Sequence, residues 1–242
     1  IYAFSWVLDR LAVLRRPLLN SLSFVGVGAG TMIAGLVCIV LMRTGASSAQ
    51  AWISFGLLAL AVTAAVWTTY AGHGAAHAAA PRARHGGIPW SSDARLLVFC
   101  FGATGFGYII PATFLPAMAR EIIPDPALFG WAWPVFGLAA AVSTLAAATL
   151  LRGFAPRRVW AACHVVMAVG VALPVFWQGL AAILAAALCV GGTFMVITML
   201  SIQEARAVAG DQVVPLTAAM TAAFASGQIL GPLAASALLA AG

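Results

Sequence analysis

Ionisable side chains are rare inside the long apolar runs of this sequence, which limits the chemistry that the chain could perform. His164 lies about two turns into one run, and the other ionisable residues close to the runs lie at their ends: Arg120, Glu121, Glu204 and Arg206. If the runs span a bilayer, such ends reach the interface, so we interpret all of these residues as structural. An enzyme inside a bilayer needs a nucleophile with a base, paired acids or a metal cluster. The sequence shows none of these, and we do not expect the chain to be an enzyme.

Uncharged polar and aromatic residues in GATGFGYIIPATFLP (102–116) are better candidates for binding a solute. Thr104, Tyr108 and Pro111 fall on one helical stripe, where a hydroxyl and a carbonyl freed by proline could face a cavity. A second stripe holds mostly small residues that let another helix approach: Gly102, Gly105, Ile109, Ala112 and Pro116. Pro111 also predicts a kink around 107–111. The alternative is that these helix breakers serve packing alone.

Other apolar runs add further candidates. Thr217, Thr221 and Gln228 share one helical face, and a glutamine in hydrocarbon needs a partner in another helix or in water. Threonines can instead bond their own helix, and an outer tryptophan can belong to an ordinary aromatic belt. The predicted substrate-binding residues are Thr104, Tyr108, Trp131, Thr193, Thr198, Thr221 and Gln228.

No metal site or cofactor is expected. His73 and His77 have the i, i+4 spacing of helical metal ligands, but no third ligand lies nearby. The four cysteines stand alone inside apolar runs, without metal-ligand spacing. GVGAG (26–30) has the glycines of a dinucleotide fingerprint but lies within an apolar run, so we interpret it as a packing face.

Composition predicts a membrane protein with several spans. The chain is 63% hydrophobic and 7% charged, with a mean hydropathy of +1.04, whereas soluble domains are roughly 25% charged. A spanning helix needs about 20 apolar residues. Seven stretches meet this length: 20–42, 50–71, 95–118, 128–151, 158–177, 179–202 and 214–240.

The arginines predict the orientation of these spans. There is no lysine, and the net charge of +6 comes from twelve arginines against six acids. If the segment 9–19 is inside, ten arginines fall in inside loops or ends and only Arg43 and Arg120 fall outside. Since the arginines are scattered between apolar runs and form no soluble patch, a nucleic-acid partner is not expected.

Several segments carry a family resemblance: GFGYIIPATFLPAMARE (105–121), PDPALFGWAWPVFGLAAAVST (124–144), GGTFMVITMLSIQEAR (191–206) and AAMTAAFASGQILGP (218–232). They are similar to the second half of YbfB/YjiJ-type permeases, bacterial members of the major facilitator superfamily (MFS). LLRGFAPRRVW (151–161) resembles a degenerate form of the cytoplasmic loop motif of that superfamily, with an acidic residue and a glycine replaced. The resemblance covers essentially the whole chain, which would run from the end of span 4 to span 11 of twelve.

The resemblance implies an all-α polytopic membrane protein with the major facilitator fold of two six-helix bundles, truncated at both ends. It assigns 1–71 to the N-terminal bundle, 72–94 to a cytoplasmic linker and 95–242 to the C-terminal bundle. The linker is rich in Ala, Gly, Pro and His, which is typical of a flexible connection.

The function that the resemblance implies is secondary transport of a small molecule by alternating access, and we expect efflux. Spans 7 and 10 would line the site, helped by spans 5, 8 and 11, and the scarcity of buried charge favours a neutral or amphipathic solute. We expect a monomer in the lipid bilayer of the bacterial inner membrane, and coupling to protons is left open. A membrane-embedded enzyme and a non-transporting polytopic protein are the alternatives.

Overall fold

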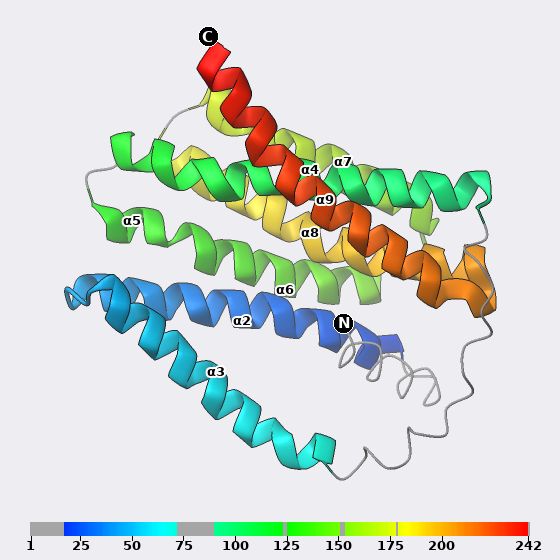
Figure 1. The fold of residues 1–242 in the computed structure, drawn as a ribbon, viewed down its shortest axis with the longest axis horizontal. Helices are drawn as coiled ribbons and strands as arrows, with labels where there is room; N and C mark the ends of the chain where they lie inside the picture. The colour runs from blue at the N-terminus through cyan, green and yellow to red at the C-terminus, as the bar shows by residue number, and fades with distance from the viewer. Residues whose placement is uncertain (1–16, 72–89, 123–124, 151–152, 178, 242) are drawn as a thin grey trace.

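The computed structural model describes residues 17–71, 90–122, 125–150, 153–177 and 179–241, and this part of the chain is helical and contains no strand (Figure 1). The helices, in chain order, are α2 (Pro17–Arg43), α3 (Ser48–Ala71), α4 (Ser92–Ile122), α5 (Pro126–Gly130), α6 (Ala132–Leu150), α7 (Pro156–Phe176), α8 (Leu180–Ala209), the short 3-10 helix η2 (Gly210–Gln212) and α9 (Val213–Ala241). The all-α prediction is confirmed.

Seven of the described helices are long and apolar enough to cross a bilayer, and each corresponds to one of the predicted spans. Only helices that satisfy their own backbone hydrogen bonds can cross lipid, which is why span length and hydropathy predict them. Many large apolar side chains are exposed along these helices, as lipid-facing surfaces require. Residues 1–16 and 72–89, which include most of the predicted linker, lie outside the described residues, so the predicted division into two bundles stays a prediction.

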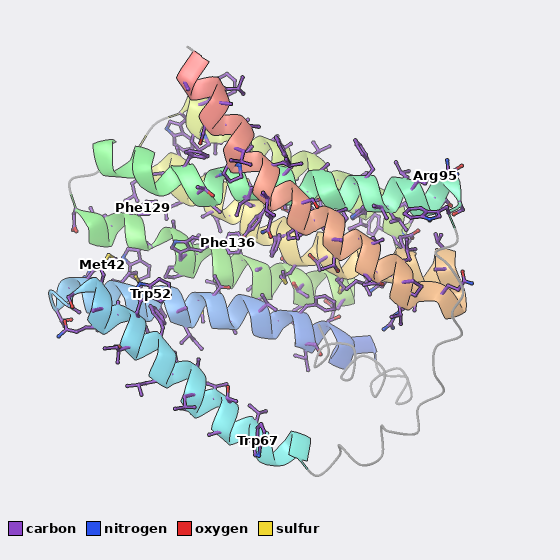
Figure 2. The ribbon with its side chains drawn as sticks, in the orientation of Figure 1. Met42, Trp52, Trp67, Arg95, Phe129 and Phe136 are labelled. Atoms are coloured by element: carbon purple, nitrogen blue, oxygen red, sulfur yellow. The ribbon has the colours of Figure 1, made fainter. Side chains whose placement is uncertain are left out.

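Helix α3 has the least contact with the rest of the structure. It joins α2 through a short turn at Gly45 and then diverges from it (Figure 1). Within its apolar window no residue is buried, and Trp52 and Trp67 are both largely exposed (Figure 2). Whatever covers α3, lipid or protein, lies beyond the described residues.

Helices α2 and α6 run side by side, and glycines bring their backbones into contact (Figure 1). A Cβ on Gly28 would lie 2.6 Å from the Ala141 nitrogen and 2.7 Å from the Gly137 carbonyl oxygen. A Cβ on Gly137 would in turn meet the backbone of Met32 and Gly28. Gly28 is the central glycine of GVGAG, so this motif packs at Gly28, whereas a Cβ on Gly26 or Gly30 would meet nothing within 4 Å in the described structure.

Helices α4 and α9 cross with equally close backbones. A Cβ on Gly105 would meet the Phe224 carbonyl oxygen, and one on Gly227 would meet the Gly102 carbonyl oxygen. Gly231 faces Ile109 at the next turn. The predicted packing stripe therefore contacts α9 at Gly102, Gly105 and Ile109, whereas the side chain of Pro116 lies outside the described residues.

Helix α8 is the most buried span and holds the others together. It packs against both α6 and α7, and its buried residues contribute to two apolar clusters that also draw on α6. A third cluster joins α4, α8 and α9 at the ends that we expect to face the cytoplasm. Trp160 of α7 contacts all three clusters, so it lies where the spans converge.

Candidate functional site

A cavity lies between α4, α5, α6 and α8, toward the ends of these helices that we predict to face outside. Its volume is about 50 Å³, and part of it opens to the surroundings. Its lining residues are almost all apolar or aromatic: Tyr108, Pro111, Ala112, Phe129, Ala132, Trp133, Phe136, Ala186, Ala187 and Val190. In Figure 2, Phe129 and Phe136 lie on α5 and α6, at the layer between these helices and α4.

Aromatic rings form the most specific part of this cavity. The ring of Tyr108 stacks on Phe194 of α8, with centroids 4.3 Å apart and planes inclined by 16°. Phe136 stands 6.2 Å from Tyr108 and 6.1 Å from Phe194, and Trp133 meets Phe136 edge-on at 5.9 Å. These spacings suit aromatic rings, whose edges and faces attract one another. A flat apolar ligand entering the cavity would find the same kinds of surface.

The close approach of α8 to α6 holds the aromatic residues in place. A Cβ on Gly191 would lie 2.8 Å from the Phe136 Cα, so only glycine lets α8 come this near. Phe194 lies about one turn further along α8, where its ring packs against Tyr108 and Phe136, two of the lining residues. On α4, Pro111 lies three residues after Tyr108, and both residues line the cavity. The kink expected at Pro111 stays a prediction.

The structure separates the predicted stripe of Thr104, Tyr108 and Pro111. Tyr108 and Pro111 line the cavity, as does Ala112, which the sequence had assigned to the packing stripe. Thr104 is buried and lies away from the lining residues, where its hydroxyl contacts His164 of α7 at 2.8 Å.

The other predicted binding residues do not gather at this cavity. Thr193, Thr198 and Thr221 donate hydrogen bonds to carbonyls of their own helices, at 2.7 to 3.0 Å. Gln228 is half-buried on α9. Trp131 precedes α6 with 41% of its surface exposed and is not among the lining residues, whereas Trp133 is.

The sequence-based prediction did not include Phe136 and Trp133, which line the cavity, or Phe194, whose ring packs against Tyr108 and Phe136. Aromatic residues are common in this chain, and a phenylalanine in an apolar run looks the same whether it faces lipid or a cavity. The His164–Thr104 contact was also missed, because its two residues lie 60 positions apart. The one sequence feature that could have suggested the contact is that both polar residues lie inside apolar spans.

An ion-pair cluster lies at the predicted cytoplasmic ends of α4, α7 and α8. Arg157 contacts Asp93 at 3.0 Å and Glu204 at 2.9 Å, so one guanidinium links three helices. Arg157 belongs to the loop segment LLRGFAPRRVW, in which the motif's acidic residue is replaced. The acidic partners come instead from α4 and α8.

The cavity has the chemistry of a binding site. The exposed wall of the cavity is almost entirely apolar, and no charged side chain is among the lining residues. Between residues 90 and 241, no group of three His, Cys, Asp or Glu side chains could hold a metal ion in the described parts. A wall of this composition favours contact with a neutral, apolar molecule over contact with a charged one.

Comparison with known proteins identifies the family. No curated protein and no solved structure matches the chain. A family model described as "Uncharacterised MFS-type transporter YbfB" matches residues 1–242, which is the full length of the chain. Together with the helices of membrane-spanning length, this match shows that the chain belongs to the YbfB family of MFS-type transporters.

Proposed function

We propose that the protein is a secondary transporter that exports a neutral aromatic or amphipathic solute from the cytoplasm by alternating access. The observation that carries this proposal is the aromatic cavity between α4, α6 and α8, with Tyr108 stacked on Phe194 at its wall. The bacterial inner membrane is the proposed location, and a monomer is the proposed functional unit.

The lining residues support the proposed class of solute. Burial of an apolar surface contributes roughly 25 cal/mol per Å², so a cavity lined by rings and aliphatic side chains favours apolar ligands. An ionised solute would lose its hydration without gaining a partner of opposite charge.

The α2–α6 contact supports alternating access. By the proposed division of the chain, α2 belongs to the first bundle and α6 to the second, so their contact joins the two bundles. It consists largely of backbone atoms around Gly28 and Gly137. Smooth backbone surfaces allow two helices to move against each other with little side-chain rearrangement. Such a movement would open the cavity of α4, α6 and α8 to one side of the membrane and then to the other.

Transport in proteoliposomes tests this function. The full-length protein would be reconstituted and offered N-phenyl-1-naphthylamine as a neutral aromatic probe, with benzoate and ethidium as anionic and cationic comparisons. We expect saturable movement of the neutral probe that is accelerated by a pH gradient, and little movement of the two ions. If all three probes move equally, or none moves in a protein-dependent way, the proposal fails.

Variants on one helix connect transport to the cavity. Tyr108→Leu removes an aromatic ring from the cavity lining, and a probe ring that packs on Tyr108 would lose about 0.5–1.5 kcal/mol beyond burial, so KM for the probe should rise about two- to tenfold. Phe99→Leu is the matched control, because Phe99 lies on the same helix with 73% of its surface exposed. Equal changes of KM in the two variants would refute the assignment of the cavity as the solute-binding site.

A further inference from the structure

Two polar side chains meet inside the bundle, away from the aromatic cavity. Thr104 of α4 is 4% exposed and His164 of α7 is half-buried, and the Thr104 Oγ1 lies 2.8 Å from the His164 Nε2. The same Oγ1 lies 2.9 Å from the carbonyl oxygen of Cys100, and the His164 Nδ1 lies 2.9 Å from the carbonyl oxygen of Trp160. This chain of contacts joins two helices of the second bundle.

The acceptors determine which protons the imidazole carries. A carbonyl oxygen can only accept, so the His164 Nδ1 must hold a proton and donate it to Trp160. Nε2 can then either lack a proton, as in neutral imidazole, or carry one, as in imidazolium. When it is bare, the Thr104 hydroxyl donates to it. When it is protonated, it donates to Oγ1, and the hydroxyl turns to donate to the Cys100 carbonyl.

Both protonation states thus find complete hydrogen bonding with the same positions of the heavy atoms. In the protonated state both imidazole N–H groups and the hydroxyl are paired, so a buried positive charge would have two acceptors in place. A hydrogen bond made only for packing would need just one of these states. The surroundings also contain an unpaired polar atom, because the indole Nε1 of Trp160 is buried without a partner in the described part of the chain.

We infer that His164 and Thr104 form a proton-binding site that couples the movement of a proton to the movement of the solute. This inference rests on the proposed transport function and extends it. A proton from the external aqueous phase binds the lone pair of Nε2 while the hydroxyl of Thr104 rotates to Cys100. After the transporter opens inward, the Nε2–H bond breaks and the proton leaves to cytoplasmic water. No other covalent bond changes, and the exchange is one proton in for one solute out.

The connection to the cavity runs along α4. Thr104 precedes Tyr108 by one helical turn, so a change at the Thr104 hydroxyl acts directly beneath the cavity wall. Protonation also makes the hydrogen bond between α4 and α7 charge-assisted, and such bonds are roughly twice as strong as neutral ones. The protonated state therefore holds α4 against α7 more tightly, which biases the position of Tyr108.

Other charges around His164 are distant or paired with one another. Arg157 precedes His164 by seven residues, about 10 Å along the axis of α7, and bonds Asp93 and Glu204. The titratable and charged residues on the described parts of α4, α7 and α8 are Asp93, Arg95, Cys100, Tyr108, Arg157, Arg158, Cys163, Cys189, Glu204 and Arg206. The imidazole is thus the basic group placed deepest among these helices.

The ratio of two transport rates tests the coupling. Rates would be measured in proteoliposomes for exchange of N-phenyl-1-naphthylamine without a pH gradient and for its gradient-driven accumulation. His164→Gln keeps an acceptor and a donor but cannot be protonated, so the ratio of driven to exchange rate should fall about tenfold or more. Thr104→Val should lower the ratio, and Thr104→Ser should restore it. Thr149→Val is the control, since Thr149 is exposed and bonds only its own helix.

Each outcome separates the coupling from the transport function. If the ratio of driven to exchange rate is unchanged in His164→Gln, the coupling is refuted and the proposed transport function still holds. The same conclusion follows if all the His164 and Thr104 variants lose both rates together. If the wild type moves no probe, the proposed function itself fails. Nitrogen NMR of ¹⁵N-histidine protein, with His164→Gln as the assignment reference, reads the site without transport. We expect Nδ1 to carry a proton in both states and Nε2 alone to gain or lose one; an Nδ1 without a proton overturns the site.

Discussion

Replacing Gly105 by alanine should weaken the crossing of α4 and α9, and the size of the effect follows from the backbone contact. The new Cβ would meet the Phe224 carbonyl oxygen and lie 3.0 Å from the Phe224 Cα, where ordinary contact begins at 3.4 Å. The atoms that the new Cβ would meet belong to the backbone, so α9 must retreat by several tenths of an ångström. Overpacking of this kind costs about 1–3 kcal/mol. Alanine regains about 1 kcal/mol through its higher helix propensity.

The matched control is Gly107→Ala on the same helix. A Cβ on Gly107 meets nothing within 4 Å in the described structure, so this variant should gain the propensity term alone. The difference between the two variants isolates the overpacking cost of about 1–3 kcal/mol, or roughly five- to 150-fold in the unfolding equilibrium. Unfolding in mixed micelles with increasing SDS measures it. Equal stability of Gly105→Ala and Gly107→Ala would refute the reasoning.

A second substitution across the crossing tests whether both glycines act through one contact. Gly227→Ala would bring a Cβ to 2.7 Å from the Phe106 nitrogen, on the turn of α4 that contains Gly105. Once α9 has retreated for one alanine, the other needs little further movement. The double variant should therefore lose clearly less stability than the sum of the two single variants. Strict additivity would mean that the contacts are independent.

Three further predictions address orientation, the ion-pair cluster and α9. Cysteine introduced at the exposed Ser48 should react with a membrane-impermeant maleimide added to intact cells, whereas cysteine at the exposed Phe154 should react only after permeabilisation. The opposite labelling pattern would show that the predicted topology is inverted. Arg157→Gln should lower thermal stability more than Asp93→Asn, because it leaves Glu204, whose side chain is only 13% exposed, without its partner. The stability loss should be smaller in high salt. Equal effects of the two variants would contradict the link between three helices. Gln228→Ala should lower the transport rate more than the amount of protein inserted if its face lines a solute path, and equal losses would assign Gln228 to packing.

The sequence predicts the spans well because lipid imposes a simple requirement. A helix that crosses a bilayer must be long and apolar, and each predicted stretch corresponds to such a helix. Partners of these helices are far less predictable. The chain has 24 glycines, so the small residues at Gly28 and Gly105 indicate close packing without indicating which helix packs there.

The candidate site was only partly predictable for the same reason. Tyr108 was found because it is a polar-tipped ring beside helix breakers, which is unusual within a span. Phe194 and Phe136 carry no such signal, since their role depends on where α8 and α6 lie relative to α4. Three predicted threonines are absent from the cavity lining, and they share one property. A hydroxyl in a helix can satisfy itself on its own backbone, and Thr193, Thr198 and Thr221 do so.

Two consecutive residues of α6 connect the contact between α2 and α6 to the cavity. Gly137 rests on the backbone of α2, while Phe136 lines the cavity and rests on Gly191 of α8. At this level α6 is confined on opposite sides, with no layer of side chains to absorb displacement. A ligand that pushes Phe136 outward therefore acts on α2 through a rigid backbone, and a shift of α2 changes the room available to the ligand. Occupancy of the cavity and the position of α2 relative to α6 would then change together.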